Sequence, residues 1–359
     1  MTAGHGADEG SAQGASLGAD LVAGLVERAA LDGSTCLPAA VLAAALRGEG
    51  IESPGPSAEA AVEAGRVTAY LDGRLFGHPT WAPLEEQVAE SVVELMTRGG
   101  PEALRVVVAP RGSTAPPATE DTSAGAVVVD TAHRLGLADA AGLLARLTAT
   151  GGAARLVLVG DPAMPYAAGP GRVLADLVDS AVVPVEEAKV QDEGQLVSLV
   201  RSLRAGDLPA VDPTQREVVV TPASDAQQAV RRAVQLVTSS VPRVFGVPAA
   251  GTLVLAPRPD GRAGAGALRA ALDEAGAPDV VVATTAEAAH SSADAVVLVL
   301  AAESAGSLHR DMLVGAATGA GRHLSVVHQA GPALAETVTR RPHPPRLTRL
   351  AALLRLALG

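Results

Sequence analysis

Residues 126–176 read AVVVDTAHRLGLADAAGLLARLTATGGAARLVLVGDPAMPYAAGPGRVLAD, and this stretch decides the fold. Two short apolar runs, 126–129 and 156–159, flank a segment in which leucines recur at three- and four-residue spacing. Unbroken apolar runs joined through an amphipathic helix are typical of a βαβ unit in a parallel sheet buried on both faces. The stretch therefore predicts an α/β protein.

Polar residues follow each apolar run at its carboxyl end. Asp130 and Thr131 follow the first run, and Gly160 and Asp161 follow the second. Open α/β sheets bind ligands outside the carboxyl ends of their strands. We therefore interpret the stretch as half of a nucleotide site.

The composition limits the function classes. The chain has 359 residues, 48% of them hydrophobic, which is enough for two or three domains. A formal net charge of −11 argues against a broad nucleic-acid-binding surface, because non-specific affinity comes mainly from Lys and Arg contacts with phosphates. The net charge does not exclude a local basic groove that binds nucleic acid. Only Lys189 is a lysine among 28 basic residues, and this arginine bias is typical of a bacterial protein with a GC-rich genome.

Cysteine usage and hydropathy indicate the cellular compartment in which the protein is expected to reside. Cys36 is the only cysteine, so an intramolecular disulfide is excluded and a reducing compartment is expected. The first residues lack the apolar core of a signal peptide, and no run approaches the roughly 20 apolar residues that span a bilayer. We expect a cytoplasmic protein without a membrane partner, in which Cys36 is a packed residue.

The N-terminal part predicts a small separate module. Residues 1–16 have few large apolar groups and are expected to be disordered. Residues 17–80 hold three helical patterns and then two short runs joined by Asp72-Gly73, a dipeptide typical of hairpin turns. Three helices and a hairpin predict a winged-helix-like α+β module. Such a module either contacts DNA or only packs against a neighbouring domain, and both alternatives stay open.

Individual residues refine this module. Pro38 suits the first position of the second helix, and Ser57 is expected to cap the third. Arg66 and Arg74, in the two runs of the hairpin, are the cations expected to contact DNA if the module binds it.

Strand and helix patterns alternate twice over in the rest of the chain. Residues 81–212 and 213–359 each predict a parallel-sheet domain, with a Pro- and Asp-rich hinge at 207–213. We expect 340–358 to form a basic amphipathic helix, whose Arg346 and Arg349 are candidate DNA contacts. This helix could bind DNA, bind an acidic partner or cover the sheet of the second domain.

Residues 155–185, RLVLVGDPAMPYAAGPGRVLADLVDSAVVPV, carry the most specific resemblance to a known family. In RecD-type DNA helicases of superfamily 1, a strand ending in Gly-Asp-Pro leads to a Gly-Pro-Gly-x-Val-Leu-x-Asp helix. The resemblance implies two RecA-like domains of the P-loop NTPase type, a truncated helicase 1A domain and a UvrD-like 2A domain, behind the winged-helix-like module. It also implies ATP and Mg²⁺ between the two domains, and 5′→3′ DNA unwinding in repair or recombination.

The phosphate loop of this family is not preserved. A Walker A lysine reaches the β- and γ-phosphates, yet the only lysine here, Lys189, lies far past the first strands. Gly112, Ser113 and Thr114 are the nearest relic, with Ser113 where the lysine would stand. In an alternative alignment the strand before them belongs to the family's next motif, and the loop itself is deleted.

Other groups that the resemblance would require are also replaced. The family's Asp-Glu pair is Asp130-Thr131, and threonine cannot act as a general base near neutral pH. Segment 163–165 replaces a phosphate-sensing glutamine, while 189–191 and 318–320 each lack the family's arginine. Asp130 and Asp161 either still bind a metal or nucleotide or merely end their strands. The relic nucleotide site would comprise Gly112, Ser113, Thr114, Asp130, Gly160, Asp161 and Gln191.

These losses predict a protein without catalytic residues, because such groups act as a unit. We predict a helicase-like scaffold or accessory protein that binds DNA, single-stranded or duplex, or a protein partner, with no cofactor. The alternative is an active or partner-completed ATPase that uses ATP and Mg²⁺. A second alternative is a winged-helix DNA-binding regulator. The histidines lack ligand-type spacing, so no metal site is expected.

Overall fold

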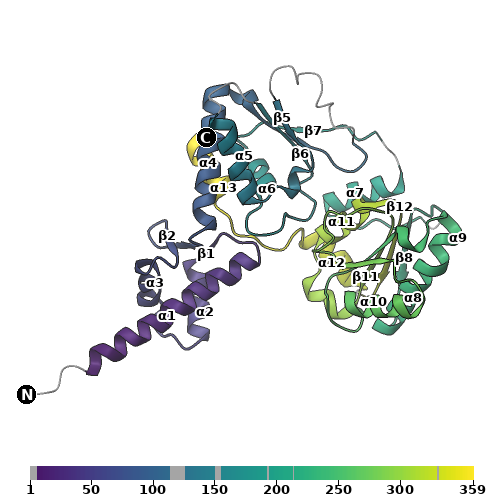
Figure 1. The fold of residues 1–359 in the computed structure, drawn as a ribbon, viewed down its shortest axis with the longest axis horizontal. Helices are drawn as coiled ribbons and strands as arrows, with labels where there is room; N and C mark the ends of the chain where they lie inside the picture. The colour runs from purple at the N-terminus through teal and green to yellow at the C-terminus, as the bar shows by residue number, and fades with distance from the viewer. Residues whose placement is uncertain (1–5, 114–125, 150–154, 192–193, 213, 330) are drawn as a thin grey trace, which may run out of the picture.

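The computed structural model describes residues 6–113, 126–149, 155–191, 194–212, 214–329 and 331–359. They form an N-terminal module and two units built on parallel sheets (Figure 1). The α/β class with two parallel sheets is confirmed.

The N-terminal module packs helices against a small antiparallel sheet. Its elements are α1 (Gly6–Leu31), β1 (Cys36–Pro38), α2 (Ala39–Gly48), α3 (Pro54–Glu63), β2 (Thr68–Tyr70) and β3 (Leu75–Gly77). The strands pair in the order β1-β3-β2. The predicted hairpin turn is confirmed, since Leu71, Asp72 and Gly73 have φ values of 54°, 55° and 77°, the left-handed region that such a turn requires.

Three details of this module differ from the sequence predictions. Helix α1 already begins at Gly6, so residues 6–16 are helical and not disordered as predicted. Residues 1–5 lie outside the described residues. Ser57 lies buried inside α3, and Ser53 takes the N-cap position. Strand β1 was not predicted, since three residues are too few to show a period.

The first parallel-sheet unit has the strand order β5-β6-β4-β7. Its strands are β4 (Leu104–Val108), β5 (Ala126–Val129), β6 (Arg155–Gly160) and β7 (Val185–Glu187). Its helices are α4 (Trp81–Gly99), η1 (Pro101–Ala103), η3 (Ala132–Arg134), α5 (Leu137–Ala149) and α6 (Val173–Ser180). The pairing of β7 with β4 begins at the Pro184 carbonyl, which accepts the Val106 N–H.

The second parallel-sheet unit has the strand order β10-β9-β11-β12-β8. Its strands are β8 (Val218–Pro222), β9 (Thr252–Ala256), β10 (Val281–Thr284), β11 (Ala293–Leu300) and β12 (Ala320–His328). Its helices are α7 (Gln195–Ala205), α8 (Ala226–Gln235), η4 (Leu236–Ser240), α9 (Val241–Phe245), η5 (Ala249–Gly251), α10 (Ala265–Glu274), η6 (Ala302–Ser307), α11 (Arg310–Gly319) and α12 (Pro332–Arg340).

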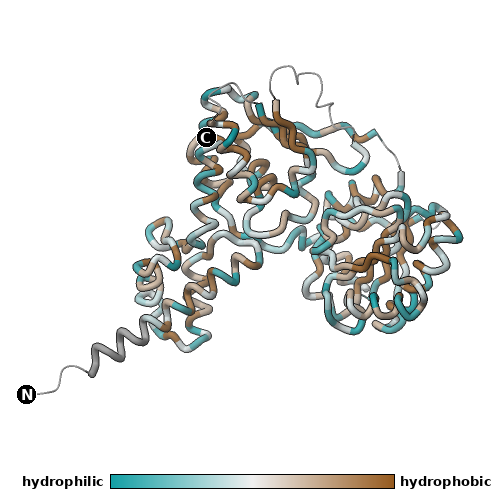
Figure 2. The backbone as a smooth tube through the Cα atoms, viewed as in Figure 1, coloured by the Kyte–Doolittle hydropathy of each residue, from teal (hydrophilic) through white to brown (hydrophobic). Residues whose placement is uncertain are grey.

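Both faces of the second sheet are covered, which explains its unbroken apolar runs. Along β11, Val296 and Leu298 pack into the core on one face, whereas Val297 and Val299 pack into the core on the other. Figure 2 shows the most hydrophobic backbone in the central strands of both parallel-sheet units. Burial on both faces removes the alternation that an exposed sheet would show.

Two helices pack in a different unit from the one that the sequence predicted. Helix α7 was assigned to the first domain, but Leu199 and Leu203 lie in the core of the second unit. Helix α13 (Leu350–Leu358) was expected to span 340–358 and to belong to the second domain. It is shorter, and Leu350 and Leu354 pack in the core of the first unit, where α13 lies beside α4 (Figure 1). Covering the second sheet is therefore excluded for this helix.

Candidate functional site at the junction of the two parallel-sheet units

The carboxyl ends of the strands in the first sheet form one edge, and this edge faces the second unit. The described relic residues all lie along it. They are Asp130 after β5, Gly160 and Asp161 at the end of β6, Gly112 and Ser113 after β4, and Gln191 after β7. Thr114 lies outside the described residues. Because β6 lies between β4 and β5, a whole strand separates the relic loop from Asp130.

Arg111, in the loop after β4, reaches across the junction. Its guanidinium donates to the carbonyls of Ala317 at 3.3 Å and Thr318 at 2.8 Å, in the last turn of α11, and to that of Gly321 at 3.2 Å. The last carbonyls of a helix have no partner within the helix and carry partial negative charge. Arg111 therefore caps a helix of the second unit.

The relic phosphate loop is bonded to itself. The Ser113 N–H and hydroxyl both donate to the Pro110 carbonyl, at 3.0 and 2.5 Å, and Gly112 adopts a φ of 77°. The Gln191 N–H donates to the Gly112 carbonyl at 3.0 Å. The structure thus places Gly112, Ser113 and Gln191 side by side, and the sequence analysis had assigned all three to one site. The Ser113 donors, however, are not turned outward as a phosphate cradle would need.

The Asp161 carboxylate forms an ion pair and is therefore not free to bind a metal ion. It is 2% exposed, accepts the Ala163 N–H at 3.0 Å and pairs with the Arg204 guanidinium of α7 at 3.2 Å. Burial raises the pKa of Asp161, and the charge of Arg204 opposes this shift. The Arg204 carbonyl in turn accepts from Arg310 at 3.1 Å. The pair therefore joins the end of β6 to the second unit.

Two histidines meet across the junction. The rings of His133 in η3 and His290 in the second unit are 5.3 Å apart between centroids. The Asp161 N–H donates to Nδ1 of His133 at 3.3 Å, so neutral His133 carries its proton on Nε2. Both ring nitrogens of His290 are buried without a hydrogen-bond partner among the described residues. Burial, with His290 and Arg134 nearby, lowers the pKa of His133 to about 4.

Gly160 is required for the close packing of this edge. A Cβ atom there would lie 2.9 Å from the backbone nitrogen of His133 and 3.0 Å from that of Ala132. The Ala109 N–H donates to the Gly160 carbonyl at 2.9 Å. This relic residue is therefore explained by packing.

The residues at this edge do not fit ATP and Mg²⁺. Asp130 is exposed at the end of β5, and Thr131 follows it in the left-handed region with a φ of 55°. Asp161 is occupied by Arg204, and the Ser113 donors are occupied by their own loop. The sequence offers no lysine or arginine between residues 114 and 125 to bind phosphates. The predicted nucleotide role therefore has no support in this geometry, and no catalytic step is derived from it.

Residues 341–349 form a segment that we call the C-terminal strap, and it holds two of the predicted DNA contacts, Arg346 and Arg349. The Arg346 guanidinium donates to the carbonyls of Ala167 at 3.1 Å, Gly169 at 2.9 Å and Gly171 at 2.7 Å. It also lies 5.0 Å from the centroid of the Tyr166 ring. Arg346 therefore binds the Gly-Pro-Gly segment of its own chain, and its role in DNA contact stays a prediction.

Arg349, the other predicted DNA contact in the strap, is buried. It is 8% exposed, lies 3.5 Å from the centroid of the Tyr70 ring, and donates to Glu86 at 3.0 Å and to the Ala82 carbonyl at 2.7 Å. Its backbone N–H donates to the Glu85 carboxylate at 3.0 Å. Burial raises the pKa of Glu85, which is 0% exposed. A guanidinium so buried cannot reach a phosphate backbone.

The strap also binds the N-terminal module. The N–H and hydroxyl of Thr35 donate to the Leu347 carbonyl at 2.9 and 3.2 Å, and the Leu347 N–H donates to the Ser34 hydroxyl at 3.1 Å. Cys36 lies buried beside the same carbonyl, as expected of a packed residue. Backbone bonds of this kind fix the module to the first unit.

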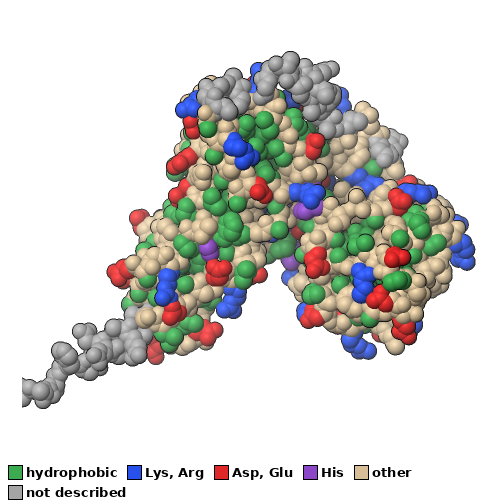
Figure 3. Space-filling model, in the orientation of Figure 1, with side chains coloured by type: hydrophobic (Ala, Val, Ile, Leu, Met, Phe, Trp, Pro, Cys, Tyr) green, Lys and Arg blue, Asp and Glu red, His purple; other side chains and the backbone are tan. Residues whose placement is uncertain are grey.

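The predicted DNA contacts of the module lie on its surface. Arg66 forms an ion pair with Asp20, and Arg74 donates to the Leu71 carbonyl at 3.1 Å. Figure 3 shows acidic and basic side chains interspersed over this face of the molecule, with histidines at the junction. The structure does not bring Arg66 and Arg74 together with Arg346 and Arg349.

Sequence reasoning missed Arg111, Arg204 and Glu85 as residues that hold the units together. The sequence could have indicated the role of Glu85, because this residue shares the apolar face of α4 with Ala82 and Val92. A carboxylate buried on such a face needs a hydrogen-bonding or charged partner. The two arginines gave no such signal. Within the described residues no group of three or more His, Cys, Asp or Glu is placed to hold a metal.

No protein-family model and no curated protein matches the sequence. Among solved structures, the chain is similar to the arterivirus nonstructural protein 10, a helicase, with a TM-score of 0.36 and 16% identity. The alignment covers 71% of this chain and 60% of the viral chain, so this chain spans less than two thirds of that protein. In the described part of the chain, no helix combines the length and hydrophobicity needed to cross a bilayer.

Proposed function

We propose that this chain is a helicase-like protein of the RecD type whose motor has lost ATP hydrolysis and DNA unwinding. Its two parallel-sheet units correspond in this proposal to the RecA-like domains, and its N-terminal module corresponds to the winged helix. It acts as an accessory scaffold that binds another protein.

One observation carries the proposal: the charged groups Arg111 and Asp161 at the junction are bonded to the protein itself. Arg111 caps α11, and Asp161 pairs with Arg204, where a motor would need groups free for phosphates and Mg²⁺. The missing phosphate-loop lysine also supports the loss of ATP hydrolysis. A protein partner is favoured over DNA because Arg346 and Arg349 bind their own chain.

Phosphate release measured with malachite green tests the loss of hydrolysis. The full chain is incubated with ATP, Mg²⁺ and single-stranded DNA, and we expect release no faster than in the buffer. Asp130→Ala is the matched variant, since its exposed carboxylate lies at the carboxyl end of β5 on this edge. DNA-stimulated release that disappears in Asp130→Ala would overturn the proposal in favour of an active or partner-completed ATPase.

Thermal unfolding tests nucleotide binding separately. A ligand that binds only the folded state stabilises it by RT ln(1 + [L]/Kd), about 2.7 kcal/mol at 100 times Kd. We expect no rise in Tm with millimolar ATP and Mg²⁺. A concentration-dependent rise would show that the junction still holds a nucleotide, contrary to the geometry of its polar groups.

A further inference from the structure

The N-terminal module contains an open groove between α2, α3 and the hairpin β2-β3. Its volume is about 550 Å³, within the range typical of binding sites. Leu42, Ala58 and Phe76 form its buried floor. Small residues, among them Ala43 and Ala69, form its walls and leave room for large side chains of another molecule.

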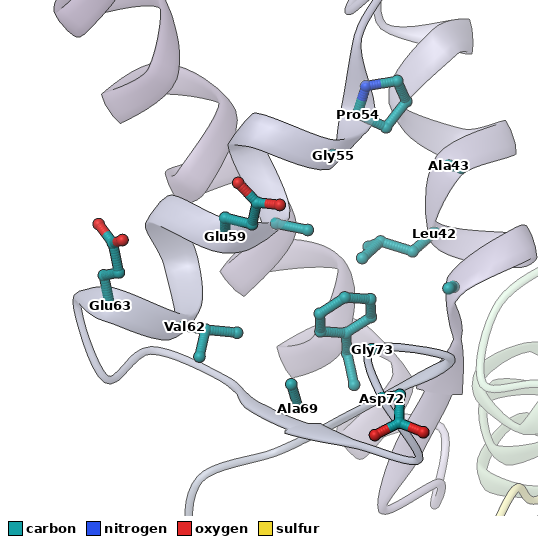
Figure 4. A pocket seen from close by; sticks show the side chains of 13 residues that line it. Leu42, Ala43, Pro54, Gly55, Glu59, Val62, Glu63, Ala69, Asp72 and Gly73 are labelled. Atoms are coloured by element: carbon teal, nitrogen blue, oxygen red, sulfur yellow. The ribbon is translucent and has the colours of Figure 1, made fainter.

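The rim of this groove is acidic. Glu59 and Glu63 of α3 stand on one margin, and Asp72 of the hairpin stands on the opposite one, with Leu42 and Ala69 between them (Figure 4). All three carboxylates are exposed, and none forms an ion pair with a residue that the structure describes. Apolar walls between unpaired carboxylates complement an apolar side chain flanked by cations.

The charge of the whole module agrees with that of the rim. Residues 17–80 contain eight carboxylates and four arginines, a net charge of −4. Nucleic acid binds through Lys and Arg contacts with phosphates, so this face repels it. An acidic peptide would be repelled for the same reason.

We propose that this groove binds a basic amphipathic segment of a partner protein, which inserts large apolar side chains between Glu59, Glu63 and Asp72. Such segments place apolar anchors at helical spacing into a groove, with cations on the flanks. The anchors supply affinity, and the acidic rim selects the basic partner. The inference goes beyond the loss of hydrolysis and holds whether or not the junction binds ATP.

Fluorescence anisotropy with designed peptides tests this inference on the full chain. The probe is a labelled peptide of about 15 residues, roughly the shortest length at which an isolated helix persists, with Leu and Phe on one face and Arg and Lys on the other. Two further peptides replace the cations by Glu or the apolar residues by Ser. We expect only the basic amphipathic peptide to bind.

Two variants locate the binding. Ala69→Phe fills the groove from an exposed strand position, and Glu59→Lys/Glu63→Lys reverses the rim. Each is expected to weaken binding at least about tenfold, equivalent to roughly 1.4 kcal/mol. Ala44→Phe, on an exposed position of α2 outside the groove lining, and Glu90→Lys/Glu274→Lys, outside the module, are the matched controls and should leave binding unchanged.

Several outcomes would overturn the inference. They are failure of the basic amphipathic peptide to bind, binding that is indifferent to both groove variants, and displacement of the peptide by duplex DNA. A dimer that dissociates in Ala69→Phe would assign the groove to a second copy of this chain instead. If Ala69→Phe lowers Tm, the rim reversal on the surface of α3 decides the test.

Discussion

The Arg111 guanidinium lies 2.8 Å from the Thr318 carbonyl oxygen, and these two residues belong to different parallel-sheet units. The contact joins the loop that would hold a phosphate to the end of α11. Both bonded groups are part of the chain itself, so this contact links the two parallel-sheet units directly.

Replacement of Arg111 by alanine should loosen the junction. The loss leaves the carbonyls at the end of α11 without their charged donor, and hydrogen bonds to charged groups contribute about 1.5–3 kcal/mol. Urea unfolding should show a loss of this order, with faster amide exchange in 315–321. Arg105→Ala removes only an exposed ion pair with Glu186 and serves as the control. Equal effects of the two variants would contradict the capping role.

Replacement of Arg204 by methionine should destabilise the protein more strongly. It leaves the Asp161 carboxylate buried and unpaired, which typically costs about 3–5 kcal/mol. Adding Asp161→Asn should recover part of this loss, because no charge is then buried. Arg201→Met, at an exposed position of the same helix, is the matched control. Urea unfolding of the natural chain, Asp161→Asn, Arg204→Met and the double variant measures the coupling, and additive effects would exclude it.

Stability should fall as the pH is lowered through the range in which His133 titrates. Its pKa falls from 6.5 to about 4 on folding, so between these values the unfolded chain binds a proton that the folded chain does not. The unfolding free energy should therefore decrease as pH drops, by at most about 1.4 kcal/mol per pH unit from this group.

His133→Asn isolates this contribution. The asparagine oxygen can still accept the Asp161 N–H, but the side chain no longer titrates. Urea unfolding between pH 4 and 6.5 should give a shallower pH dependence for the variant than for the natural chain. If the unfolding free energies of the two proteins depend on pH in the same way, His133 titrates alike in the folded and the unfolded chain.

Replacement of Arg349 by alanine should release the C-terminal strap. The change leaves Glu85 buried without its cation and removes the guanidinium from the Tyr70 ring, so a loss of about 3–5 kcal/mol is expected. Amide exchange at Thr35 and Leu347 should rise. Arg355→Ala, on the exposed side of α13, should leave exchange at both positions unchanged. Protection that survives in Arg349→Ala would mean that the strap is held by its backbone bonds alone.

Strong apolar patterns made most of the sheet strands predictable from the sequence. Strand β9, Thr252–Ala256, is an example, because all five of its residues are buried and four of them are apolar. Helix α3 was misplaced at its start, because Ser57 offers a capping hydroxyl while the prolines before it already suit the first turn. Capping residues and first-turn prolines thus indicate competing helix starts, whereas the apolar run of a buried strand indicates only one element.

The packing partners of helices were not predictable in the same way. Helix α7 is amphipathic whichever unit it covers, so its pattern could not show that Leu203 packs in the second unit. The side chains of Arg111, Arg204 and Arg349 donate hydrogen bonds to groups that lie 43 to 267 positions away in the chain, and their roles depend on the folded arrangement. A relic motif therefore predicted which strand ends come together, but not what their side chains bind.

The place of α13 in the core of the first unit also fixes an order of events during synthesis. Leu350 and Leu354 belong to that core, yet they are translated after every strand of the second unit, β8 to β12. The core of the first unit is therefore completed only after the second unit has been translated. Until α13 is present, the apolar surface of α4 and α6 that packs against it is exposed.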